Sequence, residues 1–376
     1  MSESGQGAIT PGLAGVMVCE TRLSAVDGAR GALVLAGQAV EDVAGRLTFE
    51  EVAGLLWRAV PEVAVPEDVR AALAEARAET WAWMAADGGW RWRSLDRGDA
   101  MDALRSAAAL LPDPGERWWL PTGAMAVLLG AWLRGRAGLG PVAPSLGLSH
   151  AADLLRMASP VAAEPDPALA AALDAYLATV IDHGLNASTF AARVVTSTRS
   201  DLVSAVVAAI GALKGPLHGG APGPVLDMLD AVGDPSRARA WVEAELARGE
   251  RIMGMGHRVY RVRDPRAAVL ERALRALGSA GGGGVRLALA RAVEEAAEAA
   301  LAARKPDRAL RANVEFYTAV LLEAVGLPRE AFAATFAVGR VAGWTAHVLE
   351  ERRFGRLIRP TSRYIGPMPA TVAGAR

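Results

Sequence analysis

The sequence predicts an all-α fold, and three observations lead to this prediction. Long alanine-rich segments carry apolar residues at helical spacing. Recognisable helix starts and stops flank these segments, and the alternating pattern of strands is rare. With 376 residues, of which 52% are hydrophobic, the chain is long enough for one large domain or two unequal domains around a substantial core.

The first predicted elements lie in the N-terminal part of the chain. A short hairpin is expected near residues 31–40, and it is the main strand signal. The Thr-Phe-Glu-Glu sequence at residues 48–51 reads as a capping box, in which the threonine and the last glutamate satisfy backbone N–H groups at a helix start. Val52, Leu55 and Leu56 then fall on one face, so a helix is predicted to begin there.

Further helices are predicted along the rest of the chain. Residues 167–181 and 287–303 are rich in alanine and keep helical spacing without β-branched alternation. Residues 314–325 form another predicted helix, which Gly326 ends because glycine readily adopts the left-handed conformation at a helix C-terminus. Pro328, followed by Glu330, then starts the next predicted helix.

Composition and charge exclude several classes of protein. The 41 basic and 41 acidic residues cancel, so the chain lacks the positive field that holds nucleic acid or an anionic membrane. The longest apolar stretch, near residues 124–133, is shorter than the ~20 residues of a membrane span. Residues 1–11 lack the basic and apolar regions of a signal peptide, and the single Cys19 excludes an intrachain disulfide. These features favour a cytoplasmic protein.

Several catalytic motifs are missing. The glycine run at residues 281–284 is not followed by the Lys-Ser/Thr of a phosphate-binding loop, and no Gly-x-Ser-x-Gly nucleophile elbow occurs. The five histidines show no His-x-x-x-His or His-Glu-x-x-His spacing. A zinc site built from three distant histidines is the one metal hypothesis that the spacing leaves open.

Three of the five histidines lie in segments typical of loops or helix ends. His183 lies in Asp-His-Gly-Leu-Asn, His218 in Lys-Gly-Pro-Leu-His-Gly-Gly, and His257 in Gly-Met-Gly-His-Arg-Val-Tyr. Glycine beside a histidine lets backbone and substrate approach closely. A lone histidine in a helical protein is usually structural, but three in such settings favour a shared site.

Arginines accompany these histidines and indicate the kind of substrate. The candidates are Arg258, Arg261, Arg263 and Arg266 after His257, and Arg340 and Arg359 in later segments. Guanidinium groups bind carboxylates at two points and keep their charge, and a neutral histidine can polarise a carbonyl. The combination favours a polycarboxylate whose carbonyl must be polarised. For Arg263 and Arg352, a solvated position on a helix face is the better interpretation.

From about Gly12 to Pro367 the sequence resembles the citrate synthases. Any one shared motif is weak, and their number and order carry the resemblance. The motifs are Glu20-Thr21-Arg22-Leu23-Ser24 through Asp27-Gly28, Met101-Asp102-Ala103-Leu104-Arg105, Leu148-Ser149-His150-Ala151-Ala152, Asn186-Ala187-Ser188-Thr189-Phe190, Gly215-Pro216-Leu217-His218-Gly219-Gly220, Gly256-His257-Arg258-Val259-Tyr260 with Asp264-Pro265-Arg266, Asn313-Val314-Glu315-Phe316-Tyr317, Gly343-Trp344 with His347, and Arg359-Pro360-Thr361-Ser362.

The resemblance implies a two-domain α-helical homodimer whose smaller domain closes over a cleft. The large domain would comprise residues 1–219 and 327–376, with the dimer interface and the oxaloacetate site. The small domain would comprise residues 220–326, with the CoA side and the catalytic carboxylate. The implied reaction condenses acetyl-CoA with oxaloacetate to citrate and free CoA, by enol formation, aldol-type addition and thioester hydrolysis. Acetyl-CoA would be a cosubstrate, with no tightly bound cofactor or metal.

The resemblance also implies roles for individual residues. His218 is similar to the histidine that stabilises the enol of acetyl-CoA, His257 to the one that polarises the oxaloacetate carbonyl, and Glu315 stands where the family has its catalytic base. The residues expected to hold oxaloacetate are His183, Asn186, His257, Arg266, Arg340 and Arg359, the last of them from the partner subunit. Arg261 is expected to contact a CoA phosphate.

Two departures from the family pattern keep alternatives open. The family base is usually Asp, but here it is Glu315, and Pro222 and Pro224 follow the His218 motif where the family has Ala-Asn and polar residues. A 2-methylcitrate synthase that uses propionyl-CoA is one alternative, because one methylene contributes only ~1–3 kcal/mol of discrimination. A weakly active or non-catalytic paralogue that binds a metabolite is another, although the intact histidines and arginines argue against it.

Overall fold

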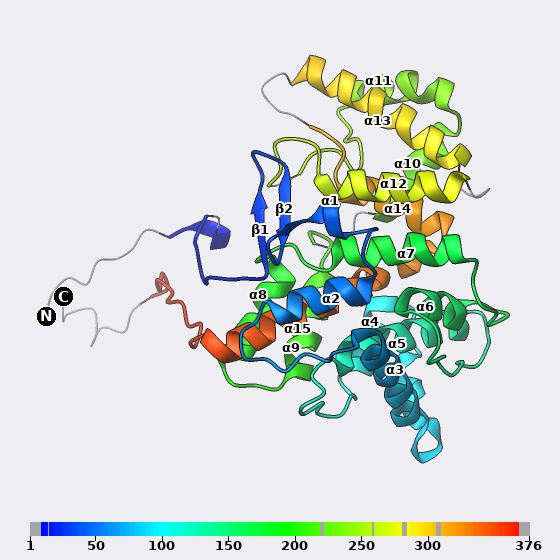
Figure 1. Cartoon of the computed structure of the whole chain (residues 1–376). Helices are drawn as coiled ribbons and strands as arrows, with labels where there is room; N and C mark the ends of the chain where they lie inside the picture. Colours follow the sequence, from blue (N-terminus) through cyan, green and yellow to red (C-terminus); the bar gives the residue numbers. More distant parts are fainter. Residues whose placement is uncertain are drawn as a thin grey trace, which may run out of the picture.

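A computed structural model describes residues 9–13, 15–218, 222–257, 259–279, 284–305 and 310–367. It is built almost entirely of helices, with one small sheet at the side, so the predicted all-α class is confirmed (Figure 1). The α-helices are α1 (Val40–Val43), α2 (Phe49–Arg58), α3 (Val69–Ala85), α4 (Ala100–Ala108), α5 (Leu120–Arg136), α6 (His150–Ala158), α7 (Pro167–Val180), α8 (Ala187–Ser197), α9 (Leu202–Leu213), α10 (Pro222–Val232), α11 (Ala238–Ala247), α12 (Pro265–Ser279), α13 (Gly284–Arg304), α14 (Val314–Ala324) and α15 (Phe332–Phe354). The 3-10 helices are η1 (Pro11–Leu13), η2 (Asp87–Leu95), η3 (Pro235–Arg237) and η4 (Arg329–Ala331).

Helix ends follow the local signals in the sequence. The capping box before α2 is confirmed, because the Thr48 side chain accepts a hydrogen bond from the Glu51 N–H at 3.2 Å and the Glu51 carboxylate accepts one from the Thr48 N–H at 2.7 Å. The segments predicted at 167–181, 287–303 and 314–325 are α7, α13 and α14. The chain leaves α14 through Gly326, whose φ of 85° is the left-handed conformation expected of a helix stop.

The sheet is larger than the sequence suggested. The hairpin predicted near residues 31–40 is confirmed as β2 (Ala32–Leu35) and β3 (Gln38–Ala39). A further strand, β1 (Ser24–Asp27), pairs antiparallel with β2, with Ser24 opposite Leu35 and Asp27 opposite Ala32. Burial alternates along β2, whereas β1 has no fully buried residue, so its sequence lacks the apolar alternation that identifies a strand.

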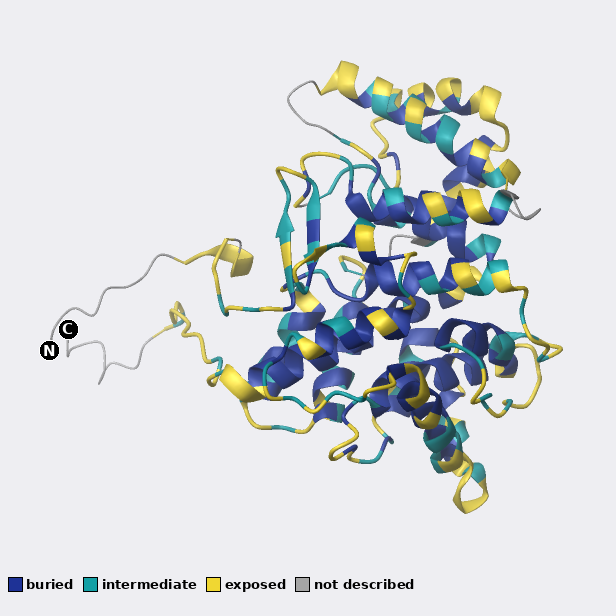
Figure 2. Cartoon of the chain, in the orientation of Figure 1, coloured by how far each residue is buried: buried dark blue, intermediate teal, exposed yellow. Residues whose placement is uncertain are grey.

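Helix α15 forms the centre of the core and packs against α2, α5, α7, α8 and α9. Nearly every residue from Phe332 to Glu351 is buried, and the turns of α15 that can be seen in Figure 2 are mostly dark blue. Glycines allow this close packing, because a Cβ on Gly343 would lie 2.1 Å from the carbonyl oxygen of Ile181. The contact fixes α15 against the end of α7, where the histidine loop at residue 183 begins. None of the described helices, α5 and α15 included, combines the length and the apolar character needed to cross a membrane.

Helices α10 to α14 pack on one another at one end of the molecule, the top of Figure 1. The group meets the rest of the protein mainly where α12 and α14 contact α7. The division into domains at residues 219/220 and 326/327 remains a prediction. Residues 219–221, where the first boundary falls, and the glycines at 281–283 lie outside the described part of the chain.

Candidate active site

The three loop histidines and the two buried arginines gather in one place. The ring centroids of His183 and His257 are 5.7 Å apart, and both rings contact that of Tyr260, at 5.6 and 4.7 Å. The Tyr260 hydroxyl lies 3.0 Å from Nε2 of His183. Burial lowers the pKa of both His183 and His218, and Arg340 adds to the effect at each. His218 is also connected to the helix of Arg340, because the Ser188 hydroxyl lies 2.8 Å from Nε2 of His218 and accepts a hydrogen bond from Trp344 at 3.1 Å.

The loop between α7 and α8 carries His183. Gly184 adopts a φ of 61°, which turns the chain sharply toward α8. The side-chain oxygen of Asn186 then caps α8 by accepting hydrogen bonds from the N–H groups of Ser188 and Thr189, both at 3.1 Å. The Asn186 amide nitrogen donates to the Gly184 carbonyl at 3.2 Å. The side chain predicted to hold oxaloacetate is therefore engaged by the backbone.

His218 is held at the N-terminus of α8. Its Nε2 accepts a hydrogen bond from the Ser188 N–H at 3.2 Å and lies 2.8 Å from the Ser188 hydroxyl. Burial, with Arg340 adding to it, lowers the pKa of His218 to about 4, so the ring is neutral. Because Nε2 is an acceptor, the proton of the neutral ring lies on Nδ1, where it can be donated to a ligand.

The loop of His257 is tied to the segment that precedes α14. Gly254 and Gly256 have positive φ angles, and Gly256 donates its N–H to the Arg311 carbonyl at 2.7 Å. The Asn313 backbone N–H donates to Gly254 at 2.9 Å, and its side-chain amide donates to Gly256 at 2.8 Å. These bonds hold His257 beside the first turn of α14.

Backbone donors also determine the tautomer of His257. Its Nδ1 accepts hydrogen bonds from the N–H groups of Val259 and Tyr260, at 3.0 and 3.1 Å. Burial, and then Arg266, lower the pKa of His257 to about 4, so the neutral ring carries its proton on Nε2. This Nε2 lies 3.5 Å from Nη2 of Arg266. Both atoms carry protons, so together they suit an oxygen acceptor placed between them.

Arg266 is anchored by the carboxylate of Asp264. The guanidinium binds that carboxylate at two points, Nε to Oδ1 at 3.0 Å and Nη2 to Oδ2 at 2.8 Å. Oδ2 of Asp264 also accepts the Val314 N–H at 3.2 Å, which connects Arg266 to the start of α14. The guanidinium is thus held rigidly in the cluster, as a preorganised binding group must be.

Arg340 is different, because it is buried without a carboxylate partner among the described residues. It is 1% exposed, and its Nε donates to the Val180 carbonyl at 2.5 Å. Burial lowers its pKa to about 10; Asp182 opposes that change and Arg266 adds to it. A buried charge is costly unless it is paired. The arrangement is therefore suited to an anion that arrives from outside the chain.

Glu315 lies in the first turn of α14, where Asn313 accepts its backbone N–H at 3.0 Å. Burial raises the pKa of this carboxyl to about 7, and Arg266 and Arg340 oppose the increase. The group therefore exchanges its proton near neutral pH, as a general base should. Its neighbours connect it to the cluster, because the Asn313 amide binds Gly256 beside His257 and the Val314 N–H binds the Asp264 carboxylate that anchors Arg266.

Two predicted site residues do not join this cluster within one chain. Arg359 is exposed on the segment that follows α15 and leads away from the helices (Figure 1). Arg261 is also exposed, and its backbone N–H donates to the Gly28 carbonyl at 2.8 Å. Their predicted roles toward a partner subunit and toward CoA stay predictions.

The solvated position expected for Arg263 is wrong, whereas Arg352 is exposed as expected. Arg263 donates to Glu294 at 2.9 Å and to Glu271 at 3.0 Å, and it is partly buried. Both glutamates lie on helices that the fold brings to Arg263, so sequence spacing did not reveal the pairing.

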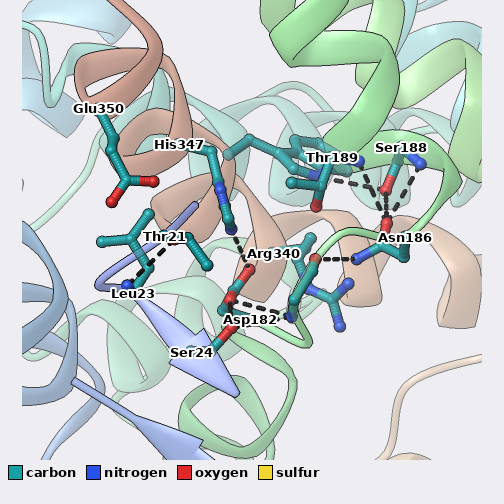
Figure 3. A network of polar contacts seen from close by, with 12 residues as sticks. Thr21, Leu23, Ser24, Asp182, Asn186, Ser188, Thr189, Arg340, His347 and Glu350 are labelled. Carbon is teal, nitrogen blue, oxygen red and sulfur yellow. Dashed lines mark hydrogen bonds and ion pairs between the residues drawn. The ribbon is translucent and has the colours of Figure 1, made fainter. Parts of the chain in front are cut away.

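A buried polar network behind the cluster had no predicted role (Figure 3). Asp182 directly precedes His183, and its carboxylate accepts hydrogen bonds from Nε2 of His347 at 3.1 Å, from the Ser24 hydroxyl and from the Gly184 N–H at 3.2 Å. Burial alone would raise the pKa of Asp182, but His347, Arg340 and Ser24 lower it to about 2. The carboxylate is ionised and holds the loop of His183 in place.

The network continues through His347 to Arg193. Nδ1 of His347 accepts a hydrogen bond from Nε of Arg193 at 3.0 Å, so the His347 proton is on Nε2 and points to Asp182. Arg193 is in turn paired with the carboxylates of Glu350 and Glu351. His347 lies in one of the quoted motifs, but its partners come from distant parts of the chain.

The arrangement suits an organic anion better than a metal. Among the residues that the structure describes, no group of three or more His, Cys, Asp or Glu side chains is placed to hold a metal ion. The cluster instead offers two guanidinium groups, neutral imidazole donors and one carboxyl, Glu315, whose pKa is about 7. Such a set can bind a polycarboxylate, polarise its carbonyl and remove a proton from a second substrate.

Comparisons with known proteins agree with this chemistry. A family model described as citrate synthase, C-terminal domain, matches residues 12–361. The putative citrate synthase 2 of Mycobacterium tuberculosis is 51% identical over 206 residues, which cover 55% of this chain and 54% of that relative, so the chain matches about half the length of that relative.

Other relatives match over nearly their whole length. The 2-methylcitrate synthase of Mycobacterium tuberculosis is 39% identical over 95% of this chain and 91% of its own. The citrate synthase of Haloferax volcanii is 38% identical over 96% of each chain. Among solved structures, the citrate synthase of the archaeon Thermoplasma acidophilum, in a ternary complex with carboxymethyl coenzyme A and oxaloacetate, matches with a TM-score of 0.82 and 27% identity, over 96% of this chain and 97% of that one.

Proposed function

The chain belongs to the citrate synthase family, and from this premise we propose that it condenses acetyl-CoA with oxaloacetate to give citrate and free CoA. The observation that carries the proposal is the buried Arg340, which has no carboxylate partner among the described residues. It acts electrostatically on Arg266, whose Nη2 lies 3.5 Å from Nε2 of neutral His257. Oxaloacetate supplies the carboxylates that such arginines require and a carbonyl for the histidine to polarise.

In this proposal oxaloacetate occupies the space between the arginines and the histidines. Its carboxylates pair with Arg340, Arg266 and His183, which offsets the cost of burying the Arg340 charge. Its carbonyl oxygen accepts the Nε2–H of His257, whose orientation the Val259 and Tyr260 N–H groups support. Because His257 is neutral, it acts as a fixed hydrogen-bond donor as charge develops on that oxygen.

The second substrate reacts at the opposite side of the cluster. The Glu315 carboxylate removes a proton from the acetyl methyl group, while the Nδ1–H of His218 stabilises the oxygen of the enol. The enol carbon then attacks the polarised carbonyl of oxaloacetate, which requires the two to be held in near-attack geometry. Hydrolysis of the resulting thioester releases CoA.

The proposal includes two domains, a homodimer and a cytoplasmic location. The segment after α15 carries Arg359 together with the exposed side chains of Leu357, Tyr364 and Ile365, which are 58%, 67% and 89% exposed. Apolar groups on an arm that leads away from its own chain are suited to a partner subunit, where Arg359 would complete the site. The exposed Arg261 is proposed to contact a CoA phosphate.

Subunit complementation tests whether Arg359 is shared. Mixing Arg359→Ala chains with His218→Ala chains produces hybrid dimers, each with one doubly altered site and one unaltered site. Random exchange is expected to restore roughly a quarter of wild-type activity, measured as turnover after exchange and compared with each variant exchanged with itself. Proven hybrid dimers without any gain would mean that Arg359 serves its own chain's site or none.

A thiol-release assay with oxaloacetate and either acetyl-CoA or propionyl-CoA tests the function itself. We expect acetyl-CoA to give the higher kcat/KM. The full-length similarity to a 2-methylcitrate synthase supports a second candidate, which a higher kcat/KM with propionyl-CoA would establish. Binding of oxaloacetate without thiol release from either thioester would instead identify a non-catalytic paralogue.

A further inference from the structure

The hairpin of β1 and β2 connects the two loops that carry His183 and His257. Figure 1 shows the strands at the side of the molecule, between the region of α8 and the region of α12. Ser24, at the start of the hairpin, contacts the His183 loop, and Gly28, in its turn, contacts the His257 loop. The proposed chemistry gives the hairpin no role.

Ser24, the first residue of β1, holds the His183 loop on both sides of the histidine. Its hydroxyl donates to the carboxylate of Asp182 and accepts the Gly184 N–H at 2.9 Å. The partners lie about 160 residues away along the chain and directly flank His183. A single hydroxyl therefore bridges the two residues that determine where this imidazole lies.

Gly28, directly after β1, holds the His257 loop. Its carbonyl accepts the Arg261 N–H at 2.8 Å. A Cβ at this position would lie 2.2 Å from the Val259 carbonyl oxygen, a distance that requires the backbone to shift. Since the Val259 and Tyr260 N–H groups orient His257, any displacement of this segment is transmitted to the imidazole.

We propose that the β1–β2 hairpin sets the spacing between His183 and His257, with Ser24 and Gly28 as positioning residues for oxaloacetate. This inference rests on the proposed function. The four residues of β1 span about 13 Å at the rise of an extended strand, a rigid distance that paired strands preserve. The two ends act on different steps, because His183 is proposed to bind a carboxylate and His257 to polarise the carbonyl.

Gly28→Ala tests the His257 end, and Gly98→Ala is the matched control because a Cβ on Gly98 meets no atom within 4 Å. A misplacement near 1 Å can cost about 10²-fold in rate, so Gly28→Ala should lower kcat by about that factor while the KM for oxaloacetate changes little. Gly98→Ala should match wild type in both constants.

Ser24→Ala tests the His183 end and does not depend on whether Gly28→Ala folds. Loss of the hydroxyl should raise the KM for oxaloacetate about tenfold, because one hydrogen bond to a charged group contributes about that factor to binding. The kcat should stay nearly unchanged. Ser24→Thr keeps the hydroxyl and suits a strand, so it should restore the KM. Calorimetric titration should likewise show weaker oxaloacetate binding in Ser24→Ala and wild-type binding in Ser24→Thr.

The split between kcat and KM separates positioning from mere support of the fold. If both variants only lose melting temperature or active fraction, with wild-type KM and kcat per active site, the hairpin is structural and the inference is wrong. Unchanged constants in Gly28→Ala and Ser24→Ala would overturn it equally. Failure of the proposed function would appear instead as a wild-type protein that neither binds oxaloacetate nor releases thiol, and the inference would fall with it.

Discussion

Glu315→Gln should lower turnover by about 10²–10⁴-fold, the contribution of a positioned general base, and leave oxaloacetate binding intact. The amide has nearly the same shape as the carboxyl but cannot accept the methyl proton of acetyl-CoA. Oxaloacetate is proposed to be held by other groups, so its affinity should persist. The measurements are thiol release and calorimetric titration of oxaloacetate. A Gln variant that turns over like wild type would show that Glu315 is not the base.

Glu315→Asp tests whether the length of the side chain matters, because it keeps the carboxyl group. The charge and the unperturbed pKa are similar, but the side chain is shorter by one methylene. If the surrounding chain is adapted to glutamate, Asp falls short of the proton, and kcat should drop by up to about 10²-fold. An Asp variant faster than wild type would show that Glu315 is not adapted to its position.

The pKa of Glu315 provides a folding control for these variants. Burial raises it from 4.5 to about 7, so the folded state holds this proton more tightly than the unfolded state does. This contribution to stability is fully present below pH 4.5 and is lost as pH rises through 7. Glu315→Gln avoids the loss, so at pH 8 it should be more stable than wild type by up to about 3 kcal/mol, with little difference at pH 4. Thermal melting at pH 4 and pH 8 checks this expectation; an inactive Gln variant that is at least as stable as wild type at pH 8 has lost the base and not the fold.

His257→Ala should lower kcat by about 10²–10³-fold, the range for the loss of one donor at a developing oxyanion. His257 is partly buried and its pKa is lowered to about 4, so the ring stays neutral between pH 6 and 8, and the factor by which His257→Ala lowers kcat should be the same across this range. Thermal melting establishes that the variant is folded, and titration with oxaloacetate separates binding from chemistry. Near-normal turnover in a folded variant would remove His257 from the mechanism.

Local patterns in the sequence identified the helical class, several of the helices and the type of chemistry. Helix starts such as Thr48 with Glu51, and stops such as Gly326, involve residues a few positions apart, so their interactions can be read without the fold. The loop histidines were found in the same way, because glycine and asparagine beside them mark chain reversals. Family motifs then joined these loops into one candidate site.

The sequence by itself therefore determined the helical class, the family resemblance and the residues available for the chemistry. Only the tertiary structure decided the protonation states: Nδ1–H on His218, Nε2–H on His257 and a carboxyl at Glu315 with a pKa of about 7. Only the structure showed, too, that Arg340 is buried without a carboxylate partner among the described residues. It also revealed β1 and its bond from Ser24 to Asp182. The physical reason is that burial and hydrogen bonding depend on residues far apart in the chain, which pack together only when the whole core has formed.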